Sequence, residues 1–286
     1  MERCDPPMPY VLTFLGVLLI LAALWLLAIR GRTGHPQLDT LRGWSYAHRG
    51  LHGDGRPENS MAAFRASLDA GYGIELDIHL LSDGNLAVLH DSKLERTTGA
   101  SGVIEDLTTD DLKNYHLEGT DETIPLFRDV LDLYAGKAPL VVELKTHDNN
   151  HAALTDAVCK MLDTYDGAYC LESFDPRCLL WLKKNRPDII RGQLTENYFA
   201  TKGVKLPFIL KWILSSNLGN FLTRPDFVAY RYGDRRHTCS NRICVKQMAG
   251  VSWTLKTQEE FDTAVAEGWI PIFEGFRPDP ARRSGN

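Results

Sequence analysis

Hydrophobic positions along the chain follow two patterns. Residues 10–29, YVLTFLGVLLILAALWLLAI, form one apolar run without a charged residue. Farther on, short apolar runs such as GIELDIHLL and PLVVELK alternate with amphipathic segments such as SMAAFRASLDAG and TQEEFDTAVAEG. The short runs have the length and residue types of strands, and the segments between them have the periodicity of helices. This alternation predicts repeated strand–helix units built around a parallel sheet.

Nine segments qualify as strands, beginning with WSYAHRG and ending with IPIFEG. The second and third, GIELDIHLL and LAVLHD, are separated only by the turn-forming residues SDGN. Because a parallel crossover needs roughly a dozen residues or more, these two segments are expected to form an antiparallel hairpin. Eight parallel strands remain, which predicts an α/β fold of the TIM (β/α)8 barrel type. A doubly wound open sheet is the alternative, but no glycine-rich phosphate loop follows any early strand.

The two patterns divide the chain into segments. We expect an N-terminal tail (1–9), a transmembrane helix (10–29), a linker rich in Gly, Thr, Pro and Arg (30–43), the barrel domain (44–277) and a C-terminal tail (278–286). A polar and irregular stretch at about 92–123 follows the hairpin strand Leu86–Asp91. It is predicted to be a small insertion packed over the mouth of the barrel.

The apolar run has the length of a membrane span, since roughly 20 residues cross about 30 Å of hydrocarbon. A cleaved signal peptide is the alternative. The run is longer than the usual apolar core of such a peptide, its leading flank is not basic, and no small-residue cleavage site follows it. Glu2, Arg3 and Asp5 precede the run, whereas Arg30, Arg32 and Arg42 follow it. The positive-inside tendency therefore predicts a single-pass, membrane-anchored protein with its catalytic domain in the cytoplasm.

Composition narrows the class of protein. Of the 286 residues, 44% are hydrophobic and 24% are charged, which is typical of a folded globular chain. The formal net charge is −5, and no basic stripe with interleaved aromatic residues occurs, so nucleic acid is not an expected partner. The cysteines beyond the apolar run have no spacing typical of a disulfide framework or a zinc site.

Polar residues interrupt the predicted strands near their carboxyl ends, where the reactive groups of barrel proteins lie. They are His48, Arg49, Glu75, Asp77, His90, Glu143 and Lys145. Residues two apart on a strand point to the same face, so Glu75 and Asp77 share one face. If the acids of both strands point inward, three carboxylates converge and need a compensating cation. A hard divalent ion, Mg²⁺ or Ca²⁺, prefers such oxygen ligands.

The remaining polar residues suit chemistry on a phosphodiester. His48 and His90 can exchange protons near neutral pH, one as a base and one as an acid. Arg49 and Lys145 add positive charge, and an arginine matches phosphate oxygens in a bidentate way. A cation and two basic side chains would stabilise charge on the phosphoryl oxygens while the histidines move protons.

Several motifs together resemble one known family. AHRG, PENSMAAF, IELDI, SDGNLAVLHD, ERTTG, VVELK, ESF and VSWTL occur in the order and spacing of the glycerophosphodiester phosphodiesterases. The resemblance implies a TIM barrel with a small inserted segment. It also implies His48 and His90 as the catalytic acid and base, Glu75, Asp77 and Glu143 as metal ligands, and Arg49 and Lys145 as phosphate contacts. The implied reaction releases an alcohol from a glycerophosphodiester and leaves sn-glycerol 3-phosphate.

For four other residues the sequence gives less support for a role in the site. The resemblance favours Glu58, although PENS also reads as the start of a helix capped by Asn59 or Ser60. Trp253 could form an aromatic wall for the substrate or belong to the barrel core. His79 lies two residues beyond Asp77 and has no evident role. Glu274 stands about where the family has aspartate, which leaves the contribution of the last strand open.

One more segment is unusually apolar. KLPFILKWILSSNLGNFL, residues 205–222, is interpreted either as a core helix or as an interfacial segment that rests on the membrane near the anchor. The expected partners are thus a small glycerophosphodiester and a membrane. Two alternative functions stay open: a phospholipase D-like or lysophospholipase D-like activity on lysophospholipids, and an inactive membrane-tethered module that binds a phosphodiester or a metal.

Overall fold

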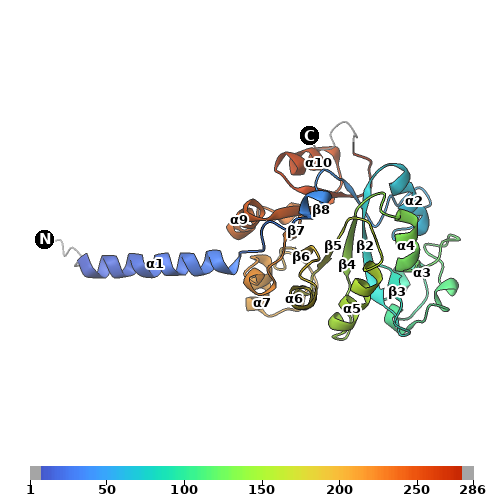
Figure 1. Cartoon of the computed structure of the whole chain (residues 1–286), viewed down its shortest axis with the longest axis horizontal. Helices are drawn as coiled ribbons and strands as arrows, with labels where there is room; N and C mark the ends of the chain where they lie inside the picture. Colours follow the sequence, from blue (N-terminus) through green and yellow to red (C-terminus); the bar gives the residue numbers. More distant parts are fainter. Residues whose placement is uncertain (1–7, 279–286) are drawn as a thin grey trace.

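The computed structural model describes residues 8–278 and contains a closed barrel of parallel strands surrounded by helices (Figure 1). The barrel strands are β1 (Tyr46–His48), β2 (Gly73–Leu80), β4 (Leu140–Leu144), β5 (Tyr169–Ser173), β6 (Arg191–Thr195), β7 (Phe227–Arg231), β8 (Ala249–Leu255) and β9 (Ile270–Phe273). Each pairs in parallel with its neighbours, and β1 closes the barrel by pairing with both β2 and β9. The predicted TIM barrel is confirmed.

The surplus strand forms the predicted hairpin. β3 (Leu86–Val88) runs antiparallel to β2, with Ile78 opposite Val88 and Leu80 opposite Leu86. The turn is closed by a backbone hydrogen bond from Leu81 N–H to the Asn85 carbonyl, at 2.9 Å. Because β2 and β3 run in opposite directions, β3 carries the chain back alongside β2. His90 lies two residues after the end of β3.

Helices cover the outside of the barrel (Figure 1). They are α2 (Met61–Asp69), α4 (Phe127–Tyr134), α5 (His151–Leu162), α6 (Pro176–Asn185), α7 (Phe208–Ser215), α8 (Asn220–Thr223), α9 (Cys239–Gln247) and α10 (Gln258–Ala266). Ser60 caps α2, as the PENS motif predicts, by accepting a hydrogen bond from Ala63 N–H. The apolar faces of α2, α4, α5 and α6 pack on the strands in one large buried cluster.

The polar stretch after β3 folds as a compact lobe. It contains α3 (Glu95–Thr98) and two short 3₁₀ turns, η2 (Ile104–Asp106) and η3 (Leu112–Asn114). Another 3₁₀ turn, η4 (Tyr232–Asp234), lies outside the lobe, after β7. The lobe has a small core of its own, which includes Leu89, Leu94, Ile104 and Leu117. It lies against the carboxyl end of β2 through the hairpin, beside the residues expected to form the site.

The N-terminal apolar run forms α1 (Met8–Ala28), which projects away from the barrel (Figure 1). Tyr10–Ala28 is apolar and long enough to cross a membrane, and none of that stretch is buried by the protein. Residues 30–43 then lie against the barrel, with Leu38 and Leu41 of η1 (Leu38–Leu41) buried at the amino ends of the strands. Apart from Met8 and Pro9, which begin α1, and Pro278, the predicted tails lie outside the described residues.

Candidate active site

Three acidic side chains meet inside the carboxyl end of the barrel. Glu75 and Asp77 come from β2 and Glu143 from β4, and Asp77 lies directly opposite Glu143 in the strand register. All three are buried, and one oxygen of each lies within 4.8 Å of the others. The alternation of side chains along a strand therefore brings together the three carboxylates, as the spacing predicts.

The charges of these acids are strongly perturbed. Burial and the neighbouring acids raise the pKa of Glu75 well above its usual value, and burial raises the pKa of Glu143 to about 7. Burial also acts to raise the pKa of Asp77, but Lys145, His90, Arg49 and the hydrogen bond from Asn59 together outweigh it and hold that pKa below its usual range. Lys145 Nζ lies 3.0 Å from Asp77 Oδ1 and 2.7 Å from Glu143 Oε1. This set of buried oxygen donors fits a hard divalent cation.

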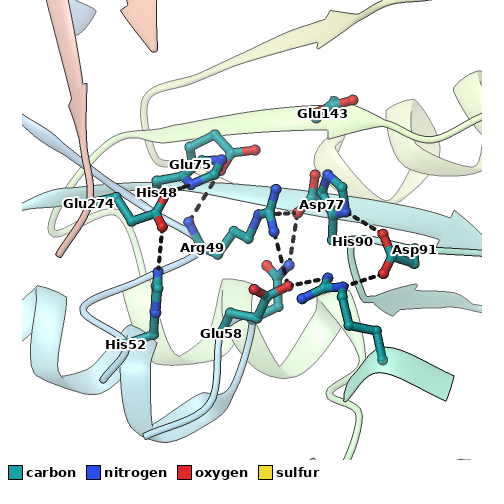
Figure 2. A network of polar contacts seen from close by, with 12 residues as sticks. His48, Arg49, His52, Glu58, Glu75, Asp77, His90, Asp91, Glu143 and Glu274 are labelled. Carbon is teal, nitrogen blue, oxygen red and sulfur yellow. Dashed lines mark hydrogen bonds and ion pairs between the residues drawn. The ribbon is translucent and has the colours of Figure 1, made fainter. Parts of the chain in front are cut away.

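His48 lies at the end of β1, next to the acidic triad (Figure 2). Its Nδ1 is 2.8 Å from Glu274 Oε2, just beyond β9, and its Nε2 is 3.8 Å from Glu75 Oε2. The hydrogen bond from His48 lowers the pKa of Glu274 to about 2, so Glu274 is an anion. An anionic acceptor assigns the proton of neutral His48 to Nδ1, which leaves Nε2 as the proton acceptor on the side of the triad.

His90 is held in the same manner from the other side. Its Nδ1 is 2.6 Å from Asp91 Oδ1, and Arg96 of α3 binds both Asp91 and Glu58, the latter at 2.6 Å. Burial lowers the pKa of His90 to about 4, so its imidazole is neutral at pH 7. Figure 2 shows His90 and Asp77 close together, with His48 on the far side of Asp77. Each histidine thus has a carboxylate on Nδ1.

Arg49 lies between the two histidines (Figure 2). Its backbone is in the left-handed region, with φ of +54°, which is unusual for a residue with a side chain. Arg49 N–H donates to Glu75 Oε2 at 3.2 Å, and Nη1 donates to Glu58 Oε1 at 3.0 Å. Its Nε is buried without a hydrogen-bond acceptor and lies 3.5 Å from Asp77 Oδ2. Arg49 therefore points its positive charge into the site.

Glu58 and Trp253, for which the sequence gives less support, lie in different parts of the structure. Glu58 joins Arg49 to Arg96 rather than lying with the acidic triad. Trp253 lies in the carboxyl half of β8, where its ring meets that of Phe174 edge-on at 5.7 Å. Its role toward a substrate stays a prediction.

His79 connects the barrel to the insertion. Its Nδ1 lies 2.6 Å from Glu105 Oε1 of η2, and its Nε2 lies 3.4 Å from the carbonyl oxygen of His90. Ser92 Oγ donates to the same Glu105 oxygen at 3.0 Å. His79 thus holds the insertion against the strand that precedes His90.

Several residues of the site were not predicted from the sequence. Asn59 Nδ2 donates to Asp77 Oδ2 at 2.8 Å, whereas the PENS motif predicts for Asn59 a place at the start of a helix. Glu172 lies opposite Glu143 on β5, fully buried, and neither of its carboxylate oxygens has a hydrogen-bond partner. Burial and Glu143 raise its pKa well above the usual value. The place of Glu172 at a strand end in ESF is a usable signal. Glu274 stands out in the sequence as a departure from the family pattern, but nothing in the sequence indicates that it contacts His48.

Fold and site together define a TIM-barrel protein with a candidate metal centre and two paired histidines at the carboxyl ends of its strands. The chain belongs to the glycerophosphoryl diester phosphodiesterase family, whose pattern matches residues 48–273. It is 35% identical, over 161 residues, to a glycerophosphodiester phosphodiesterase of Bacillus altitudinis. That match covers 52% of this chain and 65% of the relative, so the chain spans just under two thirds of that protein's length.

Solved structures agree with the fold. A putative glycerophosphoryl diester phosphodiesterase from Silicibacter pomeroyi superimposes with a TM-score of 0.69 at 20% identity, over 87% of this chain and 96% of that one. A phosphodiesterase from Oleispira antarctica, solved in complex with the product sn-glycerol-3-phosphate, gives a TM-score of 0.65 at 21% identity, over 81% of this chain and 92% of that one. At these identities the likeness establishes the barrel alone.

Proposed function

We propose that this protein hydrolyses glycerophosphodiesters to an alcohol and sn-glycerol 3-phosphate. The observation that carries the proposal is the placement of His48 and His90 on either side of one acidic triad, each with a carboxylate on Nδ1. A module that only binds a phosphodiester or a metal needs no such pair of proton carriers. The Bacillus altitudinis relative and the product named for the Oleispira antarctica structure support the same substrate class.

In this proposal Glu75, Asp77 and Glu143 hold one divalent cation, Mg²⁺ or Ca²⁺. A cation bound there supplies positive charge to the phosphoryl oxygens as negative charge develops. Arg49 and Lys145 contact the same oxygens and orient the diester, and Arg49 can do so with two parallel donors.

The two histidines move the protons. One takes a proton at Nε2 from the attacking hydroxyl, and the other gives a proton to the oxygen of the departing alcohol. Glu274 and Asp91 stabilise the imidazolium form of their partners, because each holds an anionic oxygen against Nδ1. Burial lowers the pKa of both histidines, so the one that acts as the base is neutral before the reaction begins. The one that acts as the acid enters the step as imidazolium, the form that its carboxylate partner and a bound anionic diester favour.

The direct test is release of glycerol 3-phosphate from glycerophosphocholine by the full chain, with and without a chelator. His48→Ala and His90→Ala should each lower kcat at least a hundredfold, since general acid–base catalysis contributes about 10²–10⁴-fold. Turnover that survives both substitutions would refute the assignment.

The alternative is a lysophospholipase D-like reaction, for which the exposed apolar helix α1 is the favouring observation. Lysophosphatidylcholine in place of glycerophosphocholine separates the two substrates. Binding of either diester without turnover, in protein saturated with Mg²⁺ or Ca²⁺, would identify an inactive binding module.

We also propose that α1 is a membrane anchor and that the barrel lies on the cytoplasmic side. The apolar length of Tyr10–Ala28 and the arginines that follow it support this. The end of α1 is fixed to the barrel, because Ile29 is fully buried and its carbonyl accepts from Asn220 Nδ2 at 3.1 Å. The segment 205–222 is proposed to contact the same membrane. A protease-protection assay of the full chain in sealed vesicles tests the orientation.

A further inference from the structure

Several large apolar side chains lie exposed on the segment between β6 and β7. Phe208 is 74% exposed, and its ring lies 5.3 Å from that of exposed Phe199. The set, called here the α7–α8 face, consists of Phe199, Phe208, Ile209, Trp212, Phe221 and Leu222. Folded proteins seldom expose large aromatic and aliphatic side chains together unless something covers them. The structure therefore contradicts the interpretation of 205–222 as a core helix.

The charge of the surrounding segment has one sign. Residues 197–225 contain no aspartate or glutamate, and their basic residues are Lys202, Lys205, Lys211 and Arg224. The whole chain has a net charge of −5, so this segment is a positively charged region of an acidic protein. Apolar side chains mixed with lysines fit a surface of anionic lipid, which attracts basic residues to its headgroups.

The position of α1 indicates what this face meets. α8, which carries Phe221 and Leu222, contacts α1. Arg224 Nη1, just after α8, donates to the Arg30 carbonyl at 3.0 Å, and Arg32 forms an ion pair with Asp226. Figure 1 shows α7 at the edge of the barrel from which α1 leaves. A bilayer that α1 enters therefore lies next to the α7–α8 face.

We infer that the α7–α8 face rests in the interfacial layer of the bilayer that α1 enters, with Phe208 and Trp212 among the acyl chains and the lysines at anionic headgroups. This rests on the proposal that α1 is an anchor. Because α7 belongs to the connection that leaves the carboxyl end of β6, the contact would hold the barrel in one orientation rather than leave it free to rotate about α1.

The test uses the full chain in nanodiscs of mixed neutral and anionic lipid, with Cys4→Ser and Cys239→Ser as the background. A nitroxide label is placed at Phe208→Cys. A matched label at Lys113→Cys, an exposed residue of η3, serves as the control. Lys113 belongs to the insertion, whose helix α3 lies on the side of the barrel away from α1 (Figure 1). The Phe208 label should be shielded from a water-soluble nickel relaxant and accessible to oxygen dissolved in lipid. The Lys113 label should show the reverse.

Several results would overturn the inference. Equal access of the nickel relaxant to both labels would place the face in water. Dipolar broadening of the Phe208 label that persists without anionic lipid would assign the face to a second copy of the chain. Failure of the full chain to stay with the nanodisc would refute both the proposal that α1 is a membrane anchor and the inference that the α7–α8 face contacts the bilayer. Hydrolysis of glycerophosphocholine, measured on the same samples, reports separately on the proposed function.

Lipid composition gives a second measurement. Lys205→Glu combined with Lys211→Glu removes the net positive charge of the segment and leaves every proposed active-site residue in place. In nanodiscs with anionic lipid, the double variant should make the Phe208 label at least severalfold more accessible to the nickel relaxant. In purely neutral lipid, the two proteins should differ little. An unchanged label in anionic lipid would show that the charges do not hold the face on the bilayer.

Discussion

The contact between His48 and Glu274 gives the sharpest prediction for the proposed reaction. Glu274→Gln keeps an acceptor of the same shape beside His48 Nδ1 but removes its negative charge. The carboxylate favours the imidazolium form of His48, so its loss should lower the pKa of that histidine further. The limb of the pH–rate profile that reports His48 should therefore move to lower pH, and kcat should fall because the imidazolium in the transition state is less stable.

The size of the effect follows from the geometry. The Nδ1–Oε2 distance is 2.8 Å, and the exposed fractions of the two side chains are only 14% and 24%. A hydrogen bond to a charged group contributes about 1.5–3 kcal/mol, against about 0.5–1.5 kcal/mol for a neutral pair. The difference, about 1–1.5 kcal/mol, corresponds to roughly one pH unit and to about a tenfold loss of kcat. Glu274→Ala, which also removes the acceptor, should cost about 10–100-fold.

The assay is kcat and kcat/KM for glycerophosphocholine at saturating divalent cation across the pH range. Glu267→Gln is the matched control, since Glu267 is 25% exposed and binds Arg235 at 2.8 Å but lies outside the site. Its pH profile should equal that of the unmodified chain. A Glu274→Gln profile that coincides with the control, or that shifts to higher pH, would refute the role of Glu274 as a positioning residue for His48.

Three further predictions concern the metal centre, the insertion and the unpaired acid. Divalent cation binding at about pH 6 should release protons, because burial raises the pKa of Glu143 to about 7 and metal ligands bind in their deprotonated form. Asp77→Asn should weaken cation binding. Calorimetry in buffers of different ionisation enthalpy measures both the proton release and the affinity. His79→Ala should cost about 1–3 kcal/mol of local stability and speed proteolysis of the insertion, because the buried Glu105 carboxylate loses a partner. Glu172→Gln should change the free energy of unfolding by less than about 1 kcal/mol, because a raised pKa keeps Glu172 neutral in the metal-free protein.

Each of these has an outcome that contradicts it. Proton release that is absent at pH 6 would show that Glu143 is already ionised. His116→Ala is the control for the insertion, since His116 lies in the same lobe and its ring Nδ1 is 3.0 Å from the Thr120 carbonyl, a neutral partner. If His116→Ala speeds proteolysis of the insertion as much as His79→Ala does, the contact between His79 and Glu105 does not hold the insertion in place. A large loss of stability in Glu172→Gln would indicate a charged and paired carboxylate.

The sequence by itself determined the barrel and the convergence of its three acidic side chains. Strand period, turn residues and the spacing of Glu75 and Asp77 are local properties, and local geometry decides which side chains share a face. The turn SDGN was enough to identify the hairpin, because so short a connection cannot cross between parallel strands.

Only the tertiary structure decided which partners those residues have. Glu274 meets His48 across 226 positions of the chain, and His79 meets Glu105 through the fold of the insertion. Strand alternation alone would have placed His79 in the site. Exposure of the 205–222 segment was equally undecided, because its apolar pattern fits a core helix as well as a surface one. Burial, hydrogen-bond partners and the pKa values that follow from them depend on how distant segments pack, which no local pattern contains.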